Sequence, residues 1–347
     1  MSDHIYGIFS NADIIAFSHT GHTFSDNIPD LPGFKCVSCS VRPYAAIWGG
    51  VAVFVRPGFS VESVQDLPEF GMSWFHIRHL GVSVHACICY LPHEHSSYLK
   101  REDGRLSAEA HYEALNMCVS KYRALGEVLI MGDMNARTAC VDDRCDITTL
   151  HEWQGLDVAN IPIPHDLINS FAHMHKVCDR NSCDAVSNRN GGLLIDLCRN
   201  QGLLILNGRL SGDSDGVCTY FQHGRPEASS SLIDYFISTP SLCFDDLGKD
   251  KSGTYLHVYD PIDIPPRPSG GKFDHVPIIV SVPWFKLKVI KPVHQEATGV
   301  RVFKWQNEYR DKYVNYLLTL PKVSEHLHSV HSSACIESSA QSFFFCY

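Results

Sequence analysis

The sequence lacks the signals that carry a chain into or across a membrane. Residues 1–20 have neither a basic start nor the apolar run of a signal peptide, and no later stretch is apolar over the length that spans a bilayer. We therefore expect no membrane partner and no secretion. The prediction is a protein of a reducing compartment, nuclear or cytoplasmic.

Positive charge is also scarce, which bears on any nucleic-acid function. The 29 Lys and Arg residues are outnumbered by 38 Asp and Glu residues, for a formal net charge of −9. A chain with this balance needs a local basic surface to hold a polyanion. Scattered, solvated charge is the alternative interpretation. The candidates for a basic surface, each close to a motif described below, are Arg137, Arg209, Arg225 and Lys272.

The 14 cysteines form no framework. Cys36 and Cys39 make one CxxC pair, whereas a zinc site usually has two well-spaced pairs. Disulfide scaffolds are typical of smaller secreted chains, so we expect free thiols. The histidines of His93–His95 and His173–His175 have no cysteine or carboxylate at ligand spacing. They are interpreted as exposed loop histidines, with metal binding as the alternative.

Apolar periodicity indicates alternating helices and strands. With 44% hydrophobic residues, the chain can bury one sizeable core. Residues Val82–Tyr90 alternate as a strand does. Ser107 can cap a helix that a strand at Val128–Met131 follows, and a helix near residues 193–198 precedes a strand at Leu203–Leu206. Such units predict a sheet core covered by helices.

Three polar clusters stand at the edges of apolar, strand-like runs. Asp133 and Asn135 follow the run Val128–Met131. Asp234 follows Ser-Leu-Ile, and Asp274 and His275 precede Val-Pro-Ile. Little else in these segments is charged. Since all three clusters lie where strands begin or end, we expect them to meet in one shared site.

In their order along the chain, these segments resemble the endonuclease/exonuclease/phosphatase family of metal-dependent phosphodiesterases. The particular likeness is to the endonuclease domain of non-LTR retrotransposons, which is related to the abasic-site endonucleases. The resemblance covers residues 1–285. The matching segments are Ala12–Phe17, Gly49–Phe54, Cys89–Pro92, Gly132–Ala136, Leu206–Arg209, Cys218–Tyr220, Ile233–Tyr235 and Phe273–His275.

The resemblance implies an α/β fold, a four-layer α/β sandwich with two packed central β-sheets flanked by helices, as one domain over residues 1–285. Residues 138–187 are expected to form a long surface excursion. Residues 286–347 are expected to be a C-terminal tail, partly helical at Trp305–Leu320, and the start of a linker. In relatives, the segment after the endonuclease domain leads toward a reverse transcriptase domain. We recognise no reverse transcriptase motif in this sequence.

The resemblance also implies roles for the polar residues. Asp133 would orient or deprotonate the attacking water, and Asn135 would hold this water or a phosphate oxygen. His275 would contact the scissile phosphate, while Asp234 accepts a hydrogen bond from its ring and favours the imidazolium form. Tyr90 would stabilise the phosphate or the leaving oxygen through its hydroxyl. The substrate implied is DNA.

Metal and substrate residues follow from the same resemblance. Asp274 would help to bind Mg²⁺, which prefers oxygen ligands and keeps several waters. Thr219 would support the site as a substrate-binding residue, and an ordinary strand threonine is the alternative. Asn207 and Arg209 would contact the substrate, although Asn207 in Leu-Asn-Gly-Arg also suits a turn.

Two departures from the family fall on one side of the predicted site. In the family, a stretch like Asp13–Phe17 is followed by a glutamate that is the principal metal ligand, and His19 stands at that position here. A neutral imidazole is a poor ligand for Mg²⁺ but can bind Mn²⁺. The family also begins with a strand that carries an asparagine near the metal. We find no equivalent strand, and its loss should expose a sheet edge.

The sequence therefore predicts a metal-dependent phosphodiesterase that nicks DNA, with activity impaired by His19 at the metal-ligand position and by the short N-terminus. Two alternatives stay open. One is a decayed copy that keeps the fold without turnover. The other is a non-catalytic nucleic-acid or protein interaction module that uses the same cleft.

Overall fold

The structure is a computed structural model that describes residues 12–21, 31–40, 49–79, 82–96, 99, 107–145, 165–222, 229–261, 273–282 and 341–346. The chain divides into two compact units, one of Met1–Lys288 with Gln341–Tyr347 and one of Val289–Ala340. All of the described residues belong to the first unit. The helix predicted at Trp305–Leu320 lies outside them, as do residues 1–11.

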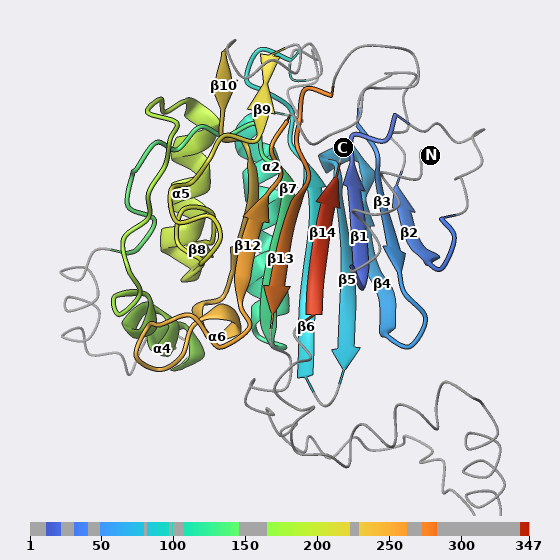
Figure 1. The fold of residues 1–347 in the computed structure, drawn as a ribbon, viewed down its shortest axis with the longest axis horizontal. Helices are drawn as coiled ribbons and strands as arrows, with labels where there is room; N and C mark the ends of the chain where they lie inside the picture. Colours follow the sequence, from blue (N-terminus) through green and yellow to red (C-terminus); the bar gives the residue numbers. More distant parts are fainter. Residues whose placement is uncertain are drawn as a thin grey trace, which may run out of the picture. The chain divides into compact units, whose positions relative to one another are not determined.

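The first sheet has six strands in the order β12-β13-β14-β1-β3-β2 (Figure 1). All neighbours are antiparallel except β14 and β1, which run parallel. The strands are β1 (Ile14–Ser18), β2 (Lys35–Ser40), β3 (Val51–Val55), β12 (Tyr255–Val258), β13 (Ile278–Val282) and β14 (Gln341–Cys346).

The second sheet also has six strands, in the order β4-β5-β6-β7-β11-β8, and only β6 and β7 are parallel. The strands predicted at residues 82–90 and 128–131 are confirmed as β6 and β7. Its strands are β4 (Ser60–Leu67), β5 (Met72–His79), β6 (Val82–Tyr90), β7 (Glu127–Asp133), β8 (Leu204–Ile205) and β11 (Asp234–Ser238). A small third sheet pairs β9 (Tyr220–Phe221) with β10 (Ser230–Ser231).

The two large sheets share one apolar core. Ile14 and Val53 of the first sheet are buried in it together with Phe75, Leu129 and Phe236 of the second. Strands covered on both faces read as continuous apolar runs, as β3 (VAVFV) does. Burial of these side chains on both sheets makes the pair of sheets the rigid base on which strand ends are placed.

Helices cover the other face of the second sheet. α2 (Ala108–Arg123) begins where the Ser107 Oγ accepts a hydrogen bond from the Ala110 N at 3.2 Å, and α5 (Arg189–Gln201) ends at Gly202 with a φ of 60°. Both bury apolar faces against β5, β6, β7 and β11. No described helix combines the length and apolar character needed to cross a membrane. The shorter helices are α4 (His165–Met174), α6 (Pro240–Cys243) and the 3-10 helix η1 (Pro68–Phe70).

The predicted fold class, α/β with two packed central sheets and flanking helices, is confirmed. The described part of the chain supplies the helical layer on the second sheet. The segment expected to be a surface excursion, residues 138–187, differs from its prediction. It contains α4 and the buried side chains of Asp143, Arg180 and Asp184. Asp143 and Asp184 are buried against arginines outside the segment, Arg209 and Arg137, and Arg180 donates to the carbonyls of Ala139 and Val141 within it.

No exposed edge lies beside β1, contrary to the expectation from the sequence. β14 pairs along β1 from Ile14↔Phe343 to Phe17↔Cys346, and it pairs with β13 on its other side. The residues Gln341–Cys346, which the sequence placed in the tail, therefore stand in the middle of the first sheet (Figure 1, red).

Candidate active site

Strand register brings polar residues together at one end of the second sheet. Tyr90 on β6 pairs with Asp133 on β7, and Asp133 pairs with Asp234 on β11. Tyr220 on β9 forms a bridge with His275, which precedes β13. The ligand atoms of Asp133, Asp234 and His275 all lie within 4.8 Å of one another. We call these three residues the acid–histidine cluster.

A tight turn after β7 holds the Asp133 carboxylate. Its Oδ1 accepts a hydrogen bond from the Asn135 backbone N at 2.7 Å, and its Oδ2 accepts one from Asn135 Nδ2 at 2.9 Å. Asn135 Nδ2 also donates to the Leu91 carbonyl at 2.8 Å. Gly132 is required, because a Cβ there would lie 1.9 Å from the Cys89 carbonyl oxygen. The Gly-Asp-Met-Asn sequence thus fixes a carboxylate that is only 2% exposed.

Thr219 ties the second carboxylate to the histidine. The Asp234 Oδ2 lies 3.0 Å from His275 Nδ1. The backbone N–H groups of Ile233 and Asp234 donate to Thr219 Oγ1 at 3.3 and 3.1 Å, and the Thr219 carbonyl accepts from the Val276 N at 2.9 Å. Thr219 is fully buried. One threonine therefore holds both the Asp234 segment and the His275 segment.

The other two residues predicted to bind substrate, Asn207 and Arg209, lie in the interior. Asn207 is fully buried; its Oδ1 accepts from the Phe236 N at 3.0 Å and its Nδ2 donates to the Asp234 carbonyl at 3.3 Å. Arg209 donates to both carboxylate oxygens of Asp143 at 2.7 and 2.6 Å, with both side chains buried. Asn207 thus braces β11 beside the acid–histidine cluster, and Arg209 is not brought to the cluster.

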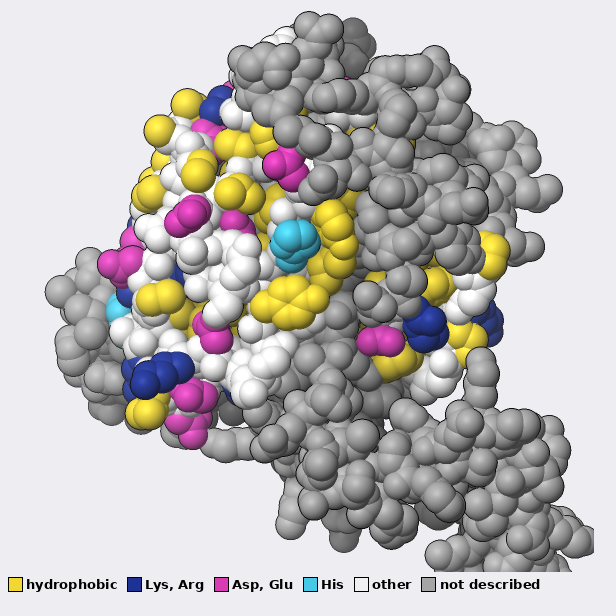
Figure 2. Space-filling model, in the orientation of Figure 1, with side chains coloured by type: hydrophobic (Ala, Val, Ile, Leu, Met, Phe, Trp, Pro, Cys, Tyr) yellow, Lys and Arg dark blue, Asp and Glu magenta, His cyan; other side chains and the backbone are white. Residues whose placement is uncertain are grey.

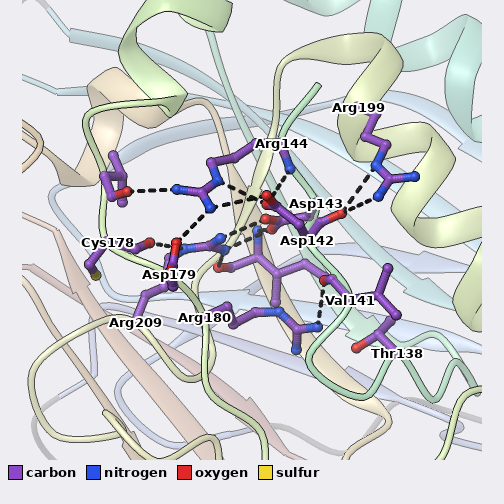
Figure 3. A network of polar contacts seen from close by, with 12 residues as sticks. Thr138, Val141, Asp142, Asp143, Arg144, Cys178, Asp179, Arg180, Arg199 and Arg209 are labelled. Carbon is purple, nitrogen blue, oxygen red and sulfur yellow. Dashed lines mark hydrogen bonds and ion pairs between the residues drawn. The ribbon is translucent and has the colours of Figure 1, made fainter. Parts of the chain in front are cut away.

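Figure 3 shows that Arg209 belongs to a larger network of polar contacts. Its Nε donates to the Cys178 carbonyl at 3.0 Å. Arg144 pairs with Asp142 and with Asp179, and Arg199 donates to the Asp142 carbonyl. The network joins residues 138–145 to the segment after α4 and to the turn after β8. Its role in the structure is to hold these loops together.

The predicted basic surface finds little support in the described residues. Arg209 is buried, and Arg137 forms a two-pronged ion pair with Asp184 at 2.8 and 2.6 Å. Arg225 and Lys272 lie outside the described part of the chain. On the face seen in Figure 2, coloured Lys and Arg side chains are scattered among Asp and Glu. Scattered charge therefore describes this part of the face better than a continuous basic surface does.

Burial and neighbouring charges shift the proton affinities of the cluster. Burial raises the pKa of Asp133 and the charge of Asp234 raises it further, against the effects of His275 and the Asn135 hydrogen bonds. Burial would lower the pKa of His275, but the charge and hydrogen bond of Asp234 outweigh it and leave the pKa raised. Asp234 Oδ1 is buried and has no hydrogen-bond partner among the described residues. The cluster thus offers a basic carboxylate, a histidine that favours its charged form, and an oxygen able to accept a cation.

His19 approaches the site from the first sheet. It follows β1 directly with a φ of 57°, and its ring stacks on the Tyr90 ring with centroids 4.8 Å apart and 27° between the planes. Asp274 is half-buried, and its carbonyl accepts from the Phe221 N at 2.6 Å. Its charge contributes to the raised pKa of His275. Neither predicted metal ligand, His19 or Asp274, is one of the three cluster residues.

Tyr220 is a residue of this site that the sequence did not single out. Its ring lies 5.0 Å from the His275 ring at an angle of 64°, and it is half-buried. The signal in the sequence was its place directly after Thr219 in Cys-Thr-Tyr. Tyr220 adds an aromatic contact beside the imidazole.

Solved structures similar to this chain include the endonuclease domain of TRAS1, a telomere-specific non-LTR retrotransposon, at 14% identity and a TM-score of 0.41, with 79% of this chain and 86% of that chain covered. The 3′-5′ exonuclease NExo from Neisseria meningitidis has 16% identity, a TM-score of 0.45, and 80% and 92% coverage. The catalytic domain of APE2 from Xenopus laevis has 15% identity, a TM-score of 0.48, and 81% and 87% coverage. No protein-family model and no curated protein matches the chain.

Proposed function

We propose that this chain is a metal-dependent phosphodiesterase of the retrotransposon-endonuclease type that hydrolyses phosphodiester bonds of DNA. The observation that carries the proposal is the acid–histidine cluster, whose ligand atoms converge within 4.8 Å at a sheet end. Phosphodiester hydrolysis needs a positioned water, a base, positive charge near the phosphate and help for the leaving oxygen. The residues around the cluster can supply these functions.

Asp133 is proposed to orient and deprotonate the attacking water. Its buried carboxylate has a raised pKa, which makes it a better proton acceptor than a solvated carboxylate. The hydrogen bonds from Asn135 hold it in one orientation, so that a water bound to it has a defined direction of attack. Asn135 is proposed to hold this water through its Oδ1, because Leu91 and Asp133 accept the two Nδ2 hydrogens.

His275 is proposed to face the scissile phosphate as an imidazolium. Asp234 accepts from Nδ1, and this interaction favours the charged ring. A positive charge in a largely buried site stabilises the growing charge on phosphate more strongly than it would in water. Tyr90, next to Asp133 in register, is proposed to stabilise the phosphate or the leaving oxygen through its hydroxyl.

The residues present fit a hard divalent cation. Asp234 Oδ1 is a buried carboxylate oxygen without a hydrogen-bond partner among the described residues, and Asp274 adds a second carboxylate directly before His275. We propose Asp274 and His19 as ligands of Mg²⁺, with Mn²⁺ as the alternative because an imidazole is a poor ligand for Mg²⁺. When bound, the cation would neutralise charge on the phosphate.

A second candidate function is a DNA-binding or protein-binding module without turnover. The observation that favours it is His19, which stacks on Tyr90 where the resemblance implies an acidic ligand. In that case the site would bind DNA but leave its strands intact. Binding without nicking distinguishes this candidate from the enzyme.

Nicking of supercoiled plasmid by the purified chain tests the proposal. Mg²⁺, Mn²⁺ and a chelator are compared in separate reactions, and DNA retention is followed by gel shift. His275→Gln is the test variant, and His257→Gln, an exposed histidine on β12, is purified in parallel as the matched control. We expect metal-dependent nicking that only His275→Gln abolishes. Equal metal-dependent nicking by both variants would show that His275 is not required and overturn the proposal.

A further inference from the structure

The first sheet is joined in its middle by a single described strand. β14 pairs with β1 on one side and with β13 on the other, and Figure 1 shows it in red between them. If β14 is removed from the strand order, the remaining described strands fall into two groups, β12-β13 and β1-β3-β2. No other ladder among the described residues connects these groups. The continuity of this sheet therefore depends on Gln341–Cys346.

Each group carries one arm of the candidate site. β1 runs toward His19, and β13 begins shortly after Asp274 and His275. The register pairs Phe17 with Cys346 and Ile278 with Phe345. Both arms thus leave the sheet at the end where β14 ends, with one strand between them.

We propose that β14 positions the two arms by setting the separation between β1 and β13. Neighbouring strands lie about 4.8 Å apart, so an inserted strand holds β1 and β13 at about 10 Å. These two strands are antiparallel to each other, because β14 is parallel to one and antiparallel to the other. Without β14 their open edges can pair directly, which would shift the arms by about 5 Å. A catalytic arrangement tolerates displacements of only about 0.5 Å.

Pairing, rather than a short connection, has to keep β14 in this place. Residues 283–340 separate it from β13 in the sequence. Closing a loop of this length costs about 3–4 kcal/mol of chain entropy, which the hydrogen bonds on both sides of the strand must offset. The Phe-Phe-Phe run at 343–345 has the aromatic composition that strands favour.

Hydrogen exchange in the full chain tests this pairing. Phe344→Pro removes a backbone N–H from a strand that is paired on both sides, and Ser333→Pro, outside the strand, is the matched control. We expect amide exchange in β1 and β13 to become at least tenfold faster in Phe344→Pro only. Exchange in β6 reports whether the second sheet stays folded. Unchanged exchange in β1 and β13 would overturn the proposal.

Disulfide trapping gives an answer if Phe344→Pro does not fold. Val280 and Phe343 lie directly opposite in the register, at a spacing of about 4.5–5.5 Å that a disulfide can bridge. The control pair, Val280→Cys with Phe345→Cys, is displaced by two residues to about 7–8 Å. We expect peptide mapping after mild oxidation to find the bond in Val280→Cys/Phe343→Cys alone. A bond in neither pair contradicts the strand order.

Turnover then separates positioning from mere stability. Phe344→Val keeps the backbone N–H and should retain the wild-type kcat. Phe344→Pro should lower kcat at least tenfold and leave the Kd for DNA unchanged, under conditions in which slow amide exchange in β6 shows that the second sheet is folded. This part rests on the proposed function. Amide exchange reports the pairing whether or not the chain hydrolyses DNA. The exchange experiment therefore still tests the role of β14 if the wild-type protein does not nick DNA. If kcat is equal in both variants although amide exchange in β1 and β13 is faster in Phe344→Pro, the positioning role is rejected.

Discussion

Asp133 and Asp234 lie directly opposite each other on the antiparallel strands β7 and β11. Burial raises the pKa of Asp133, and the negative charge of the nearby Asp234 carboxylate raises it further. His275 offsets the charge through its contact with Asp234. Because side chains alternate along a strand, a slip of one residue would turn Asp234 to the opposite face of the sheet. The site is therefore a consequence of register.

Thr219 should be needed for stability as well as for geometry. Thr219→Val removes the hydroxyl that accepts from two buried backbone N–H groups. Leaving them without a partner should lower the free energy of unfolding by about 2 kcal/mol, measured by urea denaturation. Thr219→Ser, which keeps the hydroxyl, is the matched control and should lose much less. Equal losses in both variants would mean that the methyl group, and not the hydroxyl, matters.

His19 should limit the affinity for magnesium. His19→Glu supplies the oxygen ligand that Mg²⁺ prefers, so the Mg²⁺ concentration for half-maximal nicking should fall at least tenfold. His19→Gln has a similar size without the charge and should leave this concentration unchanged or raise it. Titration of Mg²⁺ at a fixed DNA concentration measures the effect. No difference between Glu and Gln at this position would exclude His19 from the metal site.

The buried ion pair between Asp143 and Arg209 should carry more stability than its exposed neighbour. Asp143→Asn leaves the Arg209 charge buried and should cost about 3–5 kcal/mol in the free energy of unfolding. Asp142→Asn alters a half-exposed partner of Arg144 and should cost about 0–1 kcal/mol. Denaturant unfolding of both variants checks the contrast. Similar costs would show that burial of this pair has no particular weight.

His85 should make the fold sensitive to acid. Its ring stacks between His76 and Tyr122, with centroids 4.3 and 4.9 Å apart. Burial, together with the nearby charges of His76, Arg78 and Lys121, lowers the pKa of His85 from its ordinary 6.5 to about 4. Between these values the unfolded chain binds a proton that the folded chain does not. Stability from this group is therefore complete above pH 6.5 and lost as the pH falls toward 4.

The acid sensitivity is measured by urea unfolding at pH 7.5 and pH 4.5 in the wild type and in His85→Phe. Phe keeps an aromatic ring but cannot titrate. The wild type should lose about 2 kcal/mol more than the variant between these two pH values. A loss of the same size in both proteins would place the acid sensitivity elsewhere.

Local patterns were sufficient for much of the fold. The cap at Ser107, the glycine at Gly202 and the alternation of Val82–Tyr90 depend on near neighbours in the sequence, and the structure confirms the elements that they predict. The Gly-Asp-Met-Asn turn is likewise local, because Asn135 binds a carboxylate two residues away.

Pairings between distant residues could not be predicted in this way. Nothing near Arg209 in the sequence shows that Asp143 neutralises it, so its charge was interpreted as a possible contact for DNA. The run Gln341–Cys346 has no polar alternation, and its partners in β1 lie more than three hundred residues earlier. Its place in the sheet is set by the open edges of β1 and β13, which are a property of the folded structure.

The single-turnover rate of DNA nicking by Asp133→Asn tests the central claim most directly. The substitution keeps the size of the side chain and removes the carboxylate that is proposed to activate water. Asp142→Asn, at a half-exposed carboxylate in the Arg144 ion pair, is the control. With saturating Mn²⁺, the rate should fall by about 10²–10⁴-fold in Asp133→Asn and stay within twofold in the control. A folded Asp133→Asn protein that nicks at the wild-type rate would contradict the account.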